Sequence, residues 1–283
     1  MARLISNTYG KSKVRLTRVV RNGPLHSVFE MDVQILLEGA FEKVYTEGDN
    51  SACVPTDTMK NTVYALAKKH MFDSPEQFGM ILTDHFVTQF QQVSAASATI
   101  EQTIWERISL NGKPHDHAFV KGSGAKRTAV IRRERPEGFL LQGGIKNLEV
   151  MKTTHSGFVG FLKDQYTTLK ETTDRIFGTS VEANWIMEPA DADFNAVFTT
   201  ARQTILDVFA THDSLGVQHT IFEMGKQVLA AVPAIVQISF TMPNQHRILA
   251  DLEPFGMTNP SEIFVNTSEP FGLIEGTILR ETP

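Results

Sequence analysis

The chain has 283 residues, 41% of them hydrophobic, which suffices for one large domain or two of ordinary size. Lysine and arginine total 27 against 32 acidic residues, so the formal charge of −5 gives no reason to expect a broad surface for nucleic acid or anionic membrane. The apolar stretch at residues 228–240 is interrupted by Pro233 and Gln237 and is too short to cross a bilayer. Composition therefore predicts a soluble globular protein with no membrane span and no nucleic-acid partner.

The N-terminus and the cysteine content bear on the cellular compartment. Residues 1–16 lack the continuous apolar stretch and the small-residue cleavage site of a secretory signal. Cys53 is the only cysteine, which excludes an intrachain disulfide and leaves no thiolate pair for a structural zinc site. Both observations favour a reducing cytoplasm.

The first half of the chain begins with a predicted hairpin. Residues 29–38 alternate in polarity, which is typical of a half-buried strand, and the apolar face consists of Phe29, Met31, Val33, Ile35 and Leu37. A weaker alternation around Val14 and Leu16 precedes it, and the turn residues at 21–24 join the two segments.

Two helices and two further strands follow in the same half. Asp57 is expected to cap a helix that ends near His70, and residues 74–77, "SPEQ", have the composition of a capping box at the start of a second helix. The apolar stripe of that second helix consists of Phe78, Ile81, Leu82, Phe86 and Phe90. Strands are predicted again near residues 98–110 and 126–135.

The same order of elements restarts after "RPEG" at residues 135–138. Extended segments near 139–152 and 174–187 precede a helix capped by Asp193, a second helix near 219–231, and strands near 234–242, 262–267 and 272–280. Each half thus reads strand, strand, helix, helix, strand, strand, with one further short strand, 262–267, in the second half. We predict an α+β fold of two domains, residues 1–136 and 137–283, with antiparallel sheets and helices on one face. The sheet face that no helix covers and the exposed strand edges both need a partner. We therefore predict an oligomer in which the sheets of different subunits join edge to edge into a barrel.

Local patterns give few signs of chemistry. No phosphate loop, dinucleotide fingerprint or nucleophile elbow is present. His115 and His117 in "HDH" share one strand face, but two imidazoles without a third ligand favour a structural or surface role over a metal site. His85 lies on an apolar helix stripe and is expected to be a packed histidine. Thr56 and Asp57 present a hydroxyl and backbone N–H groups at a helix start, which suits either a simple cap or a polar ligand.

Several longer motifs point to one family. "YGK" at 9–11, "TDTMKNTVY" at 56–64, "GFLKDQYTTLKETTDRI" at 160–176, "VQHT" at 217–220 and "PNQH" at 243–246 closely resemble urate oxidase (uricase). The matches follow the family's order and approximate spacing, from Lys11 to "PFGLIEGTI" near the C-terminus, so the resemblance covers essentially the whole chain.

The resemblance implies a fold, an assembly and a reaction. Urate oxidases consist of two tandem tunnelling-fold (T-fold) domains and assemble as homotetramers around a central tunnel, with active sites at subunit interfaces. They oxidise urate with O2 and water to 5-hydroxyisourate and H2O2. O2 is a co-substrate, and the reaction uses neither a metal nor an organic cofactor.

The resemblance also assigns substrate-binding residues. Phe158 matches the phenylalanine that stacks on the purine, and Arg175 matches the arginine that clamps the pyrimidine-ring edge. Gln218 matches the glutamine that reads the neighbouring edge, and Val217 contributes its backbone and packing. Further binding residues are Thr56 and Asp57 of the adjacent subunit, which bind the imidazole-ring edge.

Proton transfer resembles a relay of Lys11, Thr56 and His246. Asn244 matches the asparagine that holds O2 or water above the substrate plane, in a pocket to which Thr56 also belongs. Ile274 matches an apolar residue that lines the same pocket.

Two departures and two alternatives stay open. The family commonly has Lys where this chain has Gln245, and Ala where it has Pro55, which puts local geometry or charge in doubt. The chain ends at Pro283 without the Ser-Lys-Leu peroxisomal signal of many eukaryotic members, so a bacterial, cytoplasmic enzyme is expected. The alternatives are a zinc-dependent T-fold enzyme of purine or pterin metabolism and a catalytically silent purine-binding homologue.

Overall fold

The computed structural model describes residues 2–188, 190–267 and 269–281. Contacts divide the chain into two compact units, Met1–Gly144 with Trp185–Phe198, and Ile145–Asn184 with Thr199–Pro283. The two units are defined by which residues pack together. The predicted domain boundary between residues 136 and 137 is instead based on where the order of strands and helices repeats. That boundary stays a prediction.

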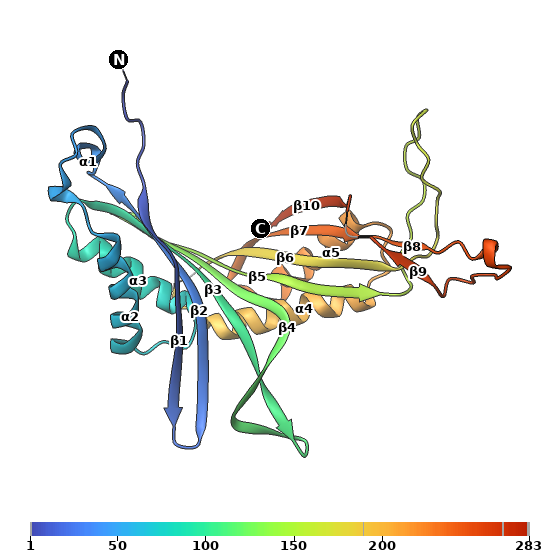
Figure 1. Cartoon of the computed structure of the whole chain (residues 1–283), viewed down its shortest axis with the longest axis horizontal. Helices are drawn as coiled ribbons and strands as arrows, with labels where there is room; N and C mark the ends of the chain where they lie inside the picture. Colours follow the sequence, from blue (N-terminus) through green and yellow to red (C-terminus); the bar gives the residue numbers. More distant parts are fainter. Residues whose placement is uncertain (1, 189, 268, 282–283) are drawn as a thin grey trace. The chain divides into compact units, whose positions relative to one another are not determined.

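The first unit contains a four-stranded antiparallel arrangement with helices on one side (Figure 1). The strands run in the order β1-β2-β3-β4, with β1 at the edge. Helices α2 and α3 pack against β1 and against β3 and β4, respectively. The elements are β1 (Tyr9–Asn22), β2 (Leu25–Gly39), α1 (Glu42–Thr46), η1 (Asn50–Ala52), α2 (Thr56–Lys69), α3 (Pro75–Gln89), β3 (Val93–Leu110) and β4 (Lys113–Glu134).

The polarity patterns explain the core of this unit. Of the apolar face predicted for β2, Met31, Val33, Ile35 and Leu37 are buried and Phe29 packs against them. The apolar stripe of α3 is buried at Phe78, Leu82 and Phe86, as its helical spacing predicts. A methyl group added to Gly79 would lie 2.5 Å from the Ile131 side chain, so α3 approaches β4 closely enough to require glycine.

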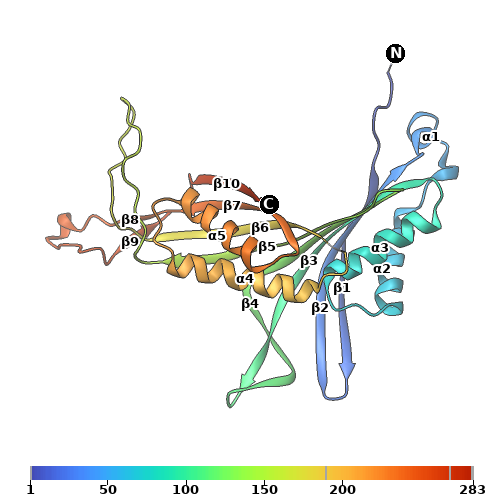
Figure 2. The same ribbon diagram turned by 180° about the vertical axis from the view of Figure 1, so that it is seen from behind.

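The second unit repeats the arrangement (Figure 2). Its strands run in the order β5-β6-β7-β10, β8 and β9 form a separate antiparallel pair, and α5 packs on β7 and β10. The ends of β5, β6 and α4 extend into the first unit. The elements are β5 (Gly138–Lys152), β6 (Phe177–Met187), α4 (Phe194–Thr211), α5 (Val217–Ala231), β7 (Ile235–Gln245), β8 (Arg247–Leu249), η2 (Glu253–Phe255), β9 (Phe264–Asn266) and β10 (Gly272–Leu279).

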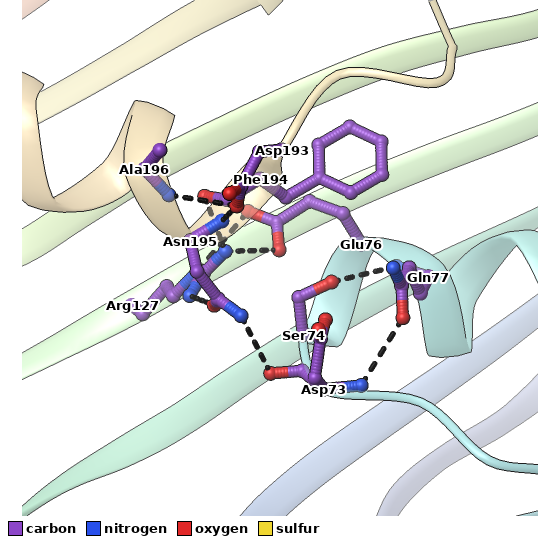
Figure 3. A network of polar contacts seen from close by, with 9 residues as sticks. All are labelled: Asp73, Ser74, Glu76, Gln77, Arg127, Asp193, Phe194, Asn195 and Ala196. Atoms are coloured by element: carbon purple, nitrogen blue, oxygen red, sulfur yellow. Dashed lines mark hydrogen bonds and ion pairs between the residues drawn. The ribbon is translucent and has the colours of Figure 1, made fainter.

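A buried ion pair joins the starts of α3 and α4 within the first unit (Figure 3). Arg127 of β4 donates to both carboxylate oxygens of Glu76, at 3.2 and 2.7 Å, and both side chains are more than nine-tenths buried. The same guanidinium donates to Asn195 Oδ1 at 2.6 Å and to the Phe194 carbonyl at 2.8 Å. Arg127 therefore has a partner on each helix start, and the predicted caps Ser74 and Asp193 are confirmed beside it.

Three local predictions need correction. Asp57 is not a cap: α2 already begins at Thr56, and the Asp57 carboxylate accepts hydrogen bonds from Lys60 and Asn61 one turn later. Helix α5 begins two residues earlier than expected, which brings Val217 and Gln218 into its first turn. Strand β7 continues through Pro243 to Gln245, because Pro243 still pairs with Leu273 of β10.

The fold is an α+β arrangement of mostly antiparallel strands with helices on one side, as predicted. Among the described residues the strand order of each unit is linear, with β1 and β10 as open edges, so neither sheet closes into a barrel within the chain. No helix in the described part of the chain is long and apolar enough to cross a membrane.

Candidate active site

The first unit brings Lys11, Thr56 and Asp57 into one region. Lys11 lies on β1 opposite the buried Ile35, and Thr56 and Asp57 form the first turn of α2, where backbone N–H groups have no carbonyl partner within the helix. The pKa of Asp57 is lowered by its hydrogen bond to Lys60 and, to a smaller degree, by the charge of Lys11. Helix α2 packs against β1, and Tyr9 of β1 accepts the Val54 N–H just before α2, so Lys11 and the start of α2 lie near each other.

A β-bulge follows Lys11 directly. Lys11 pairs with Ile35 and Val14 pairs with Val33. Two residues of β1 therefore lie between these pairs, opposite a single residue of β2. Lys13 within the bulge has φ of 59°, the left-handed region that side chains disfavour. Bulges of this kind change the direction of neighbouring side chains and occur next to active sites, which fits a functional role for Lys11.

Pro55 is compatible with this geometry. It occupies the N-cap position of α2 with φ of −57°, within the range that its ring imposes, and its carbonyl accepts the Met59 N–H at 3.1 Å. The helix therefore starts normally despite the departure from the usual alanine.

In the second unit, Phe158, Arg175 and the start of α5 lie together. The guanidinium carbon of Arg175 is 5.4 Å from the centroid of the Phe158 ring. A methyl group built on Gly216 would lie 3.7 Å from the Phe158 ring and 3.6 Å from Gln218 Oε1. The Phe158 ring and the Gln218 amide therefore lie close to each other, on the same side of Gly216. Partial burial lowers the pKa of Arg175, because desolvation disfavours the charged form. A flat ring, a cation and an amide thus face one region.

Buried hydroxyl groups hold the start of α5 in place. Thr220 Oγ1 donates to Ser214 Oγ at 2.8 Å, and Ser214 Oγ donates to the Gly216 carbonyl at 3.2 Å. The Ser214 carbonyl accepts the N–H of Gly157 at 2.8 Å, which connects this turn to the segment that carries Phe158. Ser214 and Thr220 are both at most 1% exposed. Sequence patterns offer no reason to select either residue.

Asn244 and Ile274 are neighbours across β7 and β10. Asn244 pairs with Gly272, and a methyl group built on Gly272 would lie 3.6 Å from Ile274 Cδ1 and 4.0 Å from Asn244 Cβ. The structure therefore brings together an amide and an apolar side chain that the sequence assigned to one pocket.

His246 lies at the end of β7, half-buried, between Gln245 and Arg247. Its carbonyl accepts the N–H of Thr267 at 3.2 Å, and Arg247 Nη1 donates to the carbonyls of both Gln245 and His246 at 3.2 Å. Arg247 and Arg175 line one cavity of about 530 Å³. Sequence reasoning did not select Arg247, whose guanidinium holds the backbone at the end of β7.

Histidines of the first unit outside this region make ring contacts. The rings of His115 and His117 are in contact, with centroids 4.6 Å apart, and His26 lies 5.7 Å from His117. His85 is half-buried and packs edge-on against Phe86, and burial lowers its pKa. Within residues 2–188, 190–267 and 269–281 there is no group of three or more His, Cys, Asp or Glu side chains placed to hold a metal ion.

The chain is similar to known proteins along nearly its whole length. The sequence model of the uricase family matches residues 7–132 and 141–275. The uricase of Arthrobacter globiformis is 43% identical over 275 residues, which cover 97% of this chain and 89% of that protein. The uricase of Dictyostelium discoideum is 41% identical over 284 residues, covering 99% and 98%.

Solved structures show the same fold. The crystal structure of the uricase from Arthrobacter globiformis superposes with a TM-score of 0.94 at 43% identity and covers 100% of this chain and 96% of that chain. A uricase from Bacillus fastidious superposes with a TM-score of 0.83 at 23% identity, covering 97% and 94%, a likeness that concerns the fold alone. A family match over nearly the whole length and relatives above 40% identity lead to one conclusion: the chain belongs to the uricase family.

Proposed function

We propose that the protein oxidises urate with O2 and water to 5-hydroxyisourate and H2O2. The observation that carries this proposal is the grouping of Phe158, Arg175 and Gln218 at the start of α5, within a chain of the uricase family. Urate is planar, anionic at neutral pH and surrounded by hydrogen-bonding edges, so it requires a flat apolar wall, a fixed cation and an amide.

Substrate binding uses these groups in separate roles. The Phe158 ring offers offset stacking to the purine face, and the Arg175 guanidinium donates two parallel hydrogen bonds to the pyrimidine-ring edge. Gln218 reads the adjacent edge with one donor and one acceptor, and the buried Val217 fixes the first turn of α5. Asp57 contributes a backbone N–H from the first turn of α2, together with the hydroxyl of Thr56.

The chemistry begins with proton removal. Lys11 in its neutral form takes a proton by way of the Thr56 hydroxyl, and His246 completes the relay. The resulting urate dianion is rich in electrons and passes one electron to triplet O2, which avoids the spin-forbidden direct reaction. The radical pair combines to a peroxide, and water then displaces H2O2. Asn244 holds O2 and afterwards water above the substrate plane, beside the apolar Ile274.

The assembly belongs to the same proposal. Lys11, Thr56 and Asp57 belong to the first unit, whereas Phe158, Arg175 and Gln218 belong to the second. We propose a homotetramer in which one subunit supplies the former and its neighbour supplies the latter, and in which the open edges β1 and β10 are paired between chains. The proposal includes independence from metal and organic cofactors and a cytoplasmic location of bacterial type.

Oxygen uptake tests the function directly. Purified protein is mixed with urate and a metal chelator, and O2 consumption, loss of urate absorbance and H2O2 release are followed together. We expect equal amounts of urate and O2 to disappear and the same amount of H2O2 to appear. Dependence on added zinc would favour the alternative T-fold enzymes, and urate binding without O2 uptake would favour a catalytically silent homologue.

A further inference from the structure

A hydrogen bond ties the hydroxyl of Tyr9, two residues before Lys11, to the segment that leads into α2. Tyr9 Oη accepts the backbone N–H of Val54 at 2.7 Å. The Cys53 side chain lies close to the phenol, and the Cys53 thiol donates to the Val54 carbonyl at 3.8 Å. The Tyr9 side chain of β1 therefore holds the backbone just before α2.

The surroundings of Tyr9 hold its ring in place and keep its hydroxyl protonated. Its ring packs edge-on against the fully buried Phe41, with centroids 4.9 Å apart. Burial is the main cause that raises the pKa of the Tyr9 hydroxyl, so the phenol remains neutral and retains its O–H as a donor. Val54, at 1% exposure, has no access to water for its N–H group. The Tyr9 oxygen is its hydrogen-bond acceptor, and without that oxygen a buried donor would be left unpaired.

Each partner of the Tyr9–Val54 hydrogen bond lies two residues before a proposed relay residue: Tyr9 before Lys11, and Val54 before Thr56. Tyr9 and Lys11 are joined by Gly10, where an added methyl group would lie 1.8 Å from the Ile35 carbonyl oxygen, so β1 lies tightly against β2 here. Val54 and Thr56 are joined by Pro55, whose φ is fixed by its ring. Short, stiff connections on both sides mean that the Tyr9–Val54 contact determines how far Lys11 lies from Thr56.

We propose that Tyr9 is a positioning residue that sets the geometry of proton transfer between Lys11 and Thr56. The inference rests on the proposed function, because it assigns a role to Tyr9 only through that relay. Tyr9 itself touches neither substrate nor O2; its hydroxyl acts on the backbone that carries Thr56. The three residues of the motif "YGK" then have separate roles, since Tyr9 positions the segment before Thr56, Gly10 permits close approach of the strands, and Lys11 transfers the proton.

The substitution Tyr9→Phe tests the proposal, because it removes the hydroxyl and leaves the ring on Phe41. We expect kcat for urate to fall about tenfold, since small displacements of reacting groups have effects of this size. KM is expected to stay within about twofold of wild type, because Phe158, Arg175 and Gln218 are unchanged and only the urate contacts of Thr56 and Asp57 shift. The pH dependence of kcat should also change, since the two relay groups would share the proton in a different geometry.

Tyr45→Phe is the matched control. The Tyr45 hydroxyl also binds the start of this region, by donating to the Thr8 carbonyl at 3.2 Å, but it makes no bond to the segment before Thr56. Its loss should leave kcat, KM and the pH profile unchanged. For wild type and each variant, the maximal rate is divided by the concentration of urate sites, which is measured by equilibrium binding without O2. Unfolded protein then cannot be mistaken for a catalytic loss.

The outcomes separate the two proposals. If wild type does not oxidise urate, the proposed function fails, and this inference fails with it. If wild type is active and Tyr9→Phe behaves like Tyr45→Phe, or raises KM without lowering kcat per site, Tyr9 has no positioning role. If Tyr9→Phe does not fold, Cys53→Ala replaces it, because Cys53 lies beside the phenol in the segment before Thr56 and its thiol donates to the Val54 carbonyl. The same fall in kcat at constant KM is then expected, and wild-type kinetics would contradict the proposal.

Discussion

At the scale of single residues, the proposal gives two cations different roles. Arg175→Gln removes the charge proposed to face the anionic substrate, and charged hydrogen bonds of this kind are worth about 1.5–3 kcal/mol, so KM should rise roughly ten- to hundredfold. Lys11→Met removes the proposed base, and kcat should fall by about two orders of magnitude or more with a smaller change in urate affinity. Steady-state kinetics and anaerobic urate binding distinguish the two effects.

A neighbouring lysine supplies the control for this comparison. Lys13 also lies on β1, but its side chain is 68% exposed and 3.5 Å from Asp32. Lys13→Met should therefore leave both constants near those of wild type. The assigned roles would be reversed if Arg175→Gln lowered turnover at unchanged affinity while Lys11→Met weakened binding.

His212 makes the stability of the second unit depend on pH. Burial lowers the pKa of His212, and the nearby His219 and Lys152 act in the same direction, whereas Glu223 and Asp213 oppose them. The folded protein thus disfavours the imidazolium that the unfolded chain accepts near its ordinary pKa of 6.5. Stability from this group is present above that value and is lost as the pH falls below it.

Thermal unfolding at about pH 8 and about pH 5.5 measures this effect. We expect the unfolding temperature to fall on acidification, and the fall to be smaller in His212→Gln. His155→Gln is the control, because His155 is 72% exposed and lies beside Asp213. An equal fall in wild type and His212→Gln would show that other groups cause the acid sensitivity.

At the scale of elements, Arg127 links the starts of α3 and α4. Arg127→Met leaves the Glu76 carboxylate buried without its partner, which costs about 3–5 kcal/mol in comparable sites. The double substitution with Glu76→Leu should recover part of that loss, since it removes the unpaired charge. Arg132→Met is the control, because Arg132 is more exposed and its ion pairs with Glu38 and Glu134 are worth about 1 kcal/mol or less. Denaturant unfolding gives the free energies.

At the start of α5, the Thr220 hydroxyl supports the turn that carries Gln218, which is proposed to bind urate. Thr220→Val removes the hydroxyl that donates to Ser214, and the first turn with Gln218 should become less well fixed. We expect KM for urate to rise by roughly threefold to tenfold with little change in kcat, which corresponds to about one weakened hydrogen bond. Thr211→Val removes an exposed hydroxyl that bonds within α4 and should have no effect. Equal kinetics for both variants would contradict the role of Thr220.

The elements themselves were largely predictable because their signals are local. Ser74 and Asp193 cap their helices as expected, since a short polar side chain before an apolar stripe has few other uses. Asp57 has the same local signature, yet its carboxylate binds Lys60 and Asn61, and no pattern distinguishes these outcomes. Pro243 suggested the end of a strand, whereas pairing with β10 keeps it in β7.

The site was less accessible to local reasoning. Phe158, Arg175 and Gln218 are separated by tens of residues, and their proximity depends on how β6, α5 and the intervening turns pack. In the sequence, only the resemblance to urate oxidases selects them. Tyr9 and Ser214 act through backbone groups, so that their side chains give no sign of chemistry in the sequence.

At the scale of the whole molecule, the proposed shared site predicts complementation between inactive variants. If each site takes Lys11 from one subunit and Arg175 from its neighbour, mixed tetramers of Lys11→Met and Arg175→Gln chains contain some sites with both residues intact. Random mixing should restore roughly a quarter of the sites. The mixture is unfolded and refolded together, and its urate-dependent O2 uptake is compared with each variant treated alone.

The same sample reports the assembly. Light scattering should give four times the 31.5 kDa of one chain for wild type and for the mixture. Tetramers without any recovered activity would show that both residues of a site come from a single subunit.

The open edges β1 and β10 also have a consequence for the newly made protein. Before the proposed tetramer forms, each chain, in the part that the structure describes, presents unpaired backbone groups along both edges, and Leu273 and Leu279 on β10 are 58% and 64% exposed. Such strands can pair with any other unpaired strand, including those of unrelated unfinished chains. Productive assembly therefore competes with aggregation from the moment of synthesis. Yield in a cell depends on how quickly sister chains meet, as well as on how stable the finished protein is.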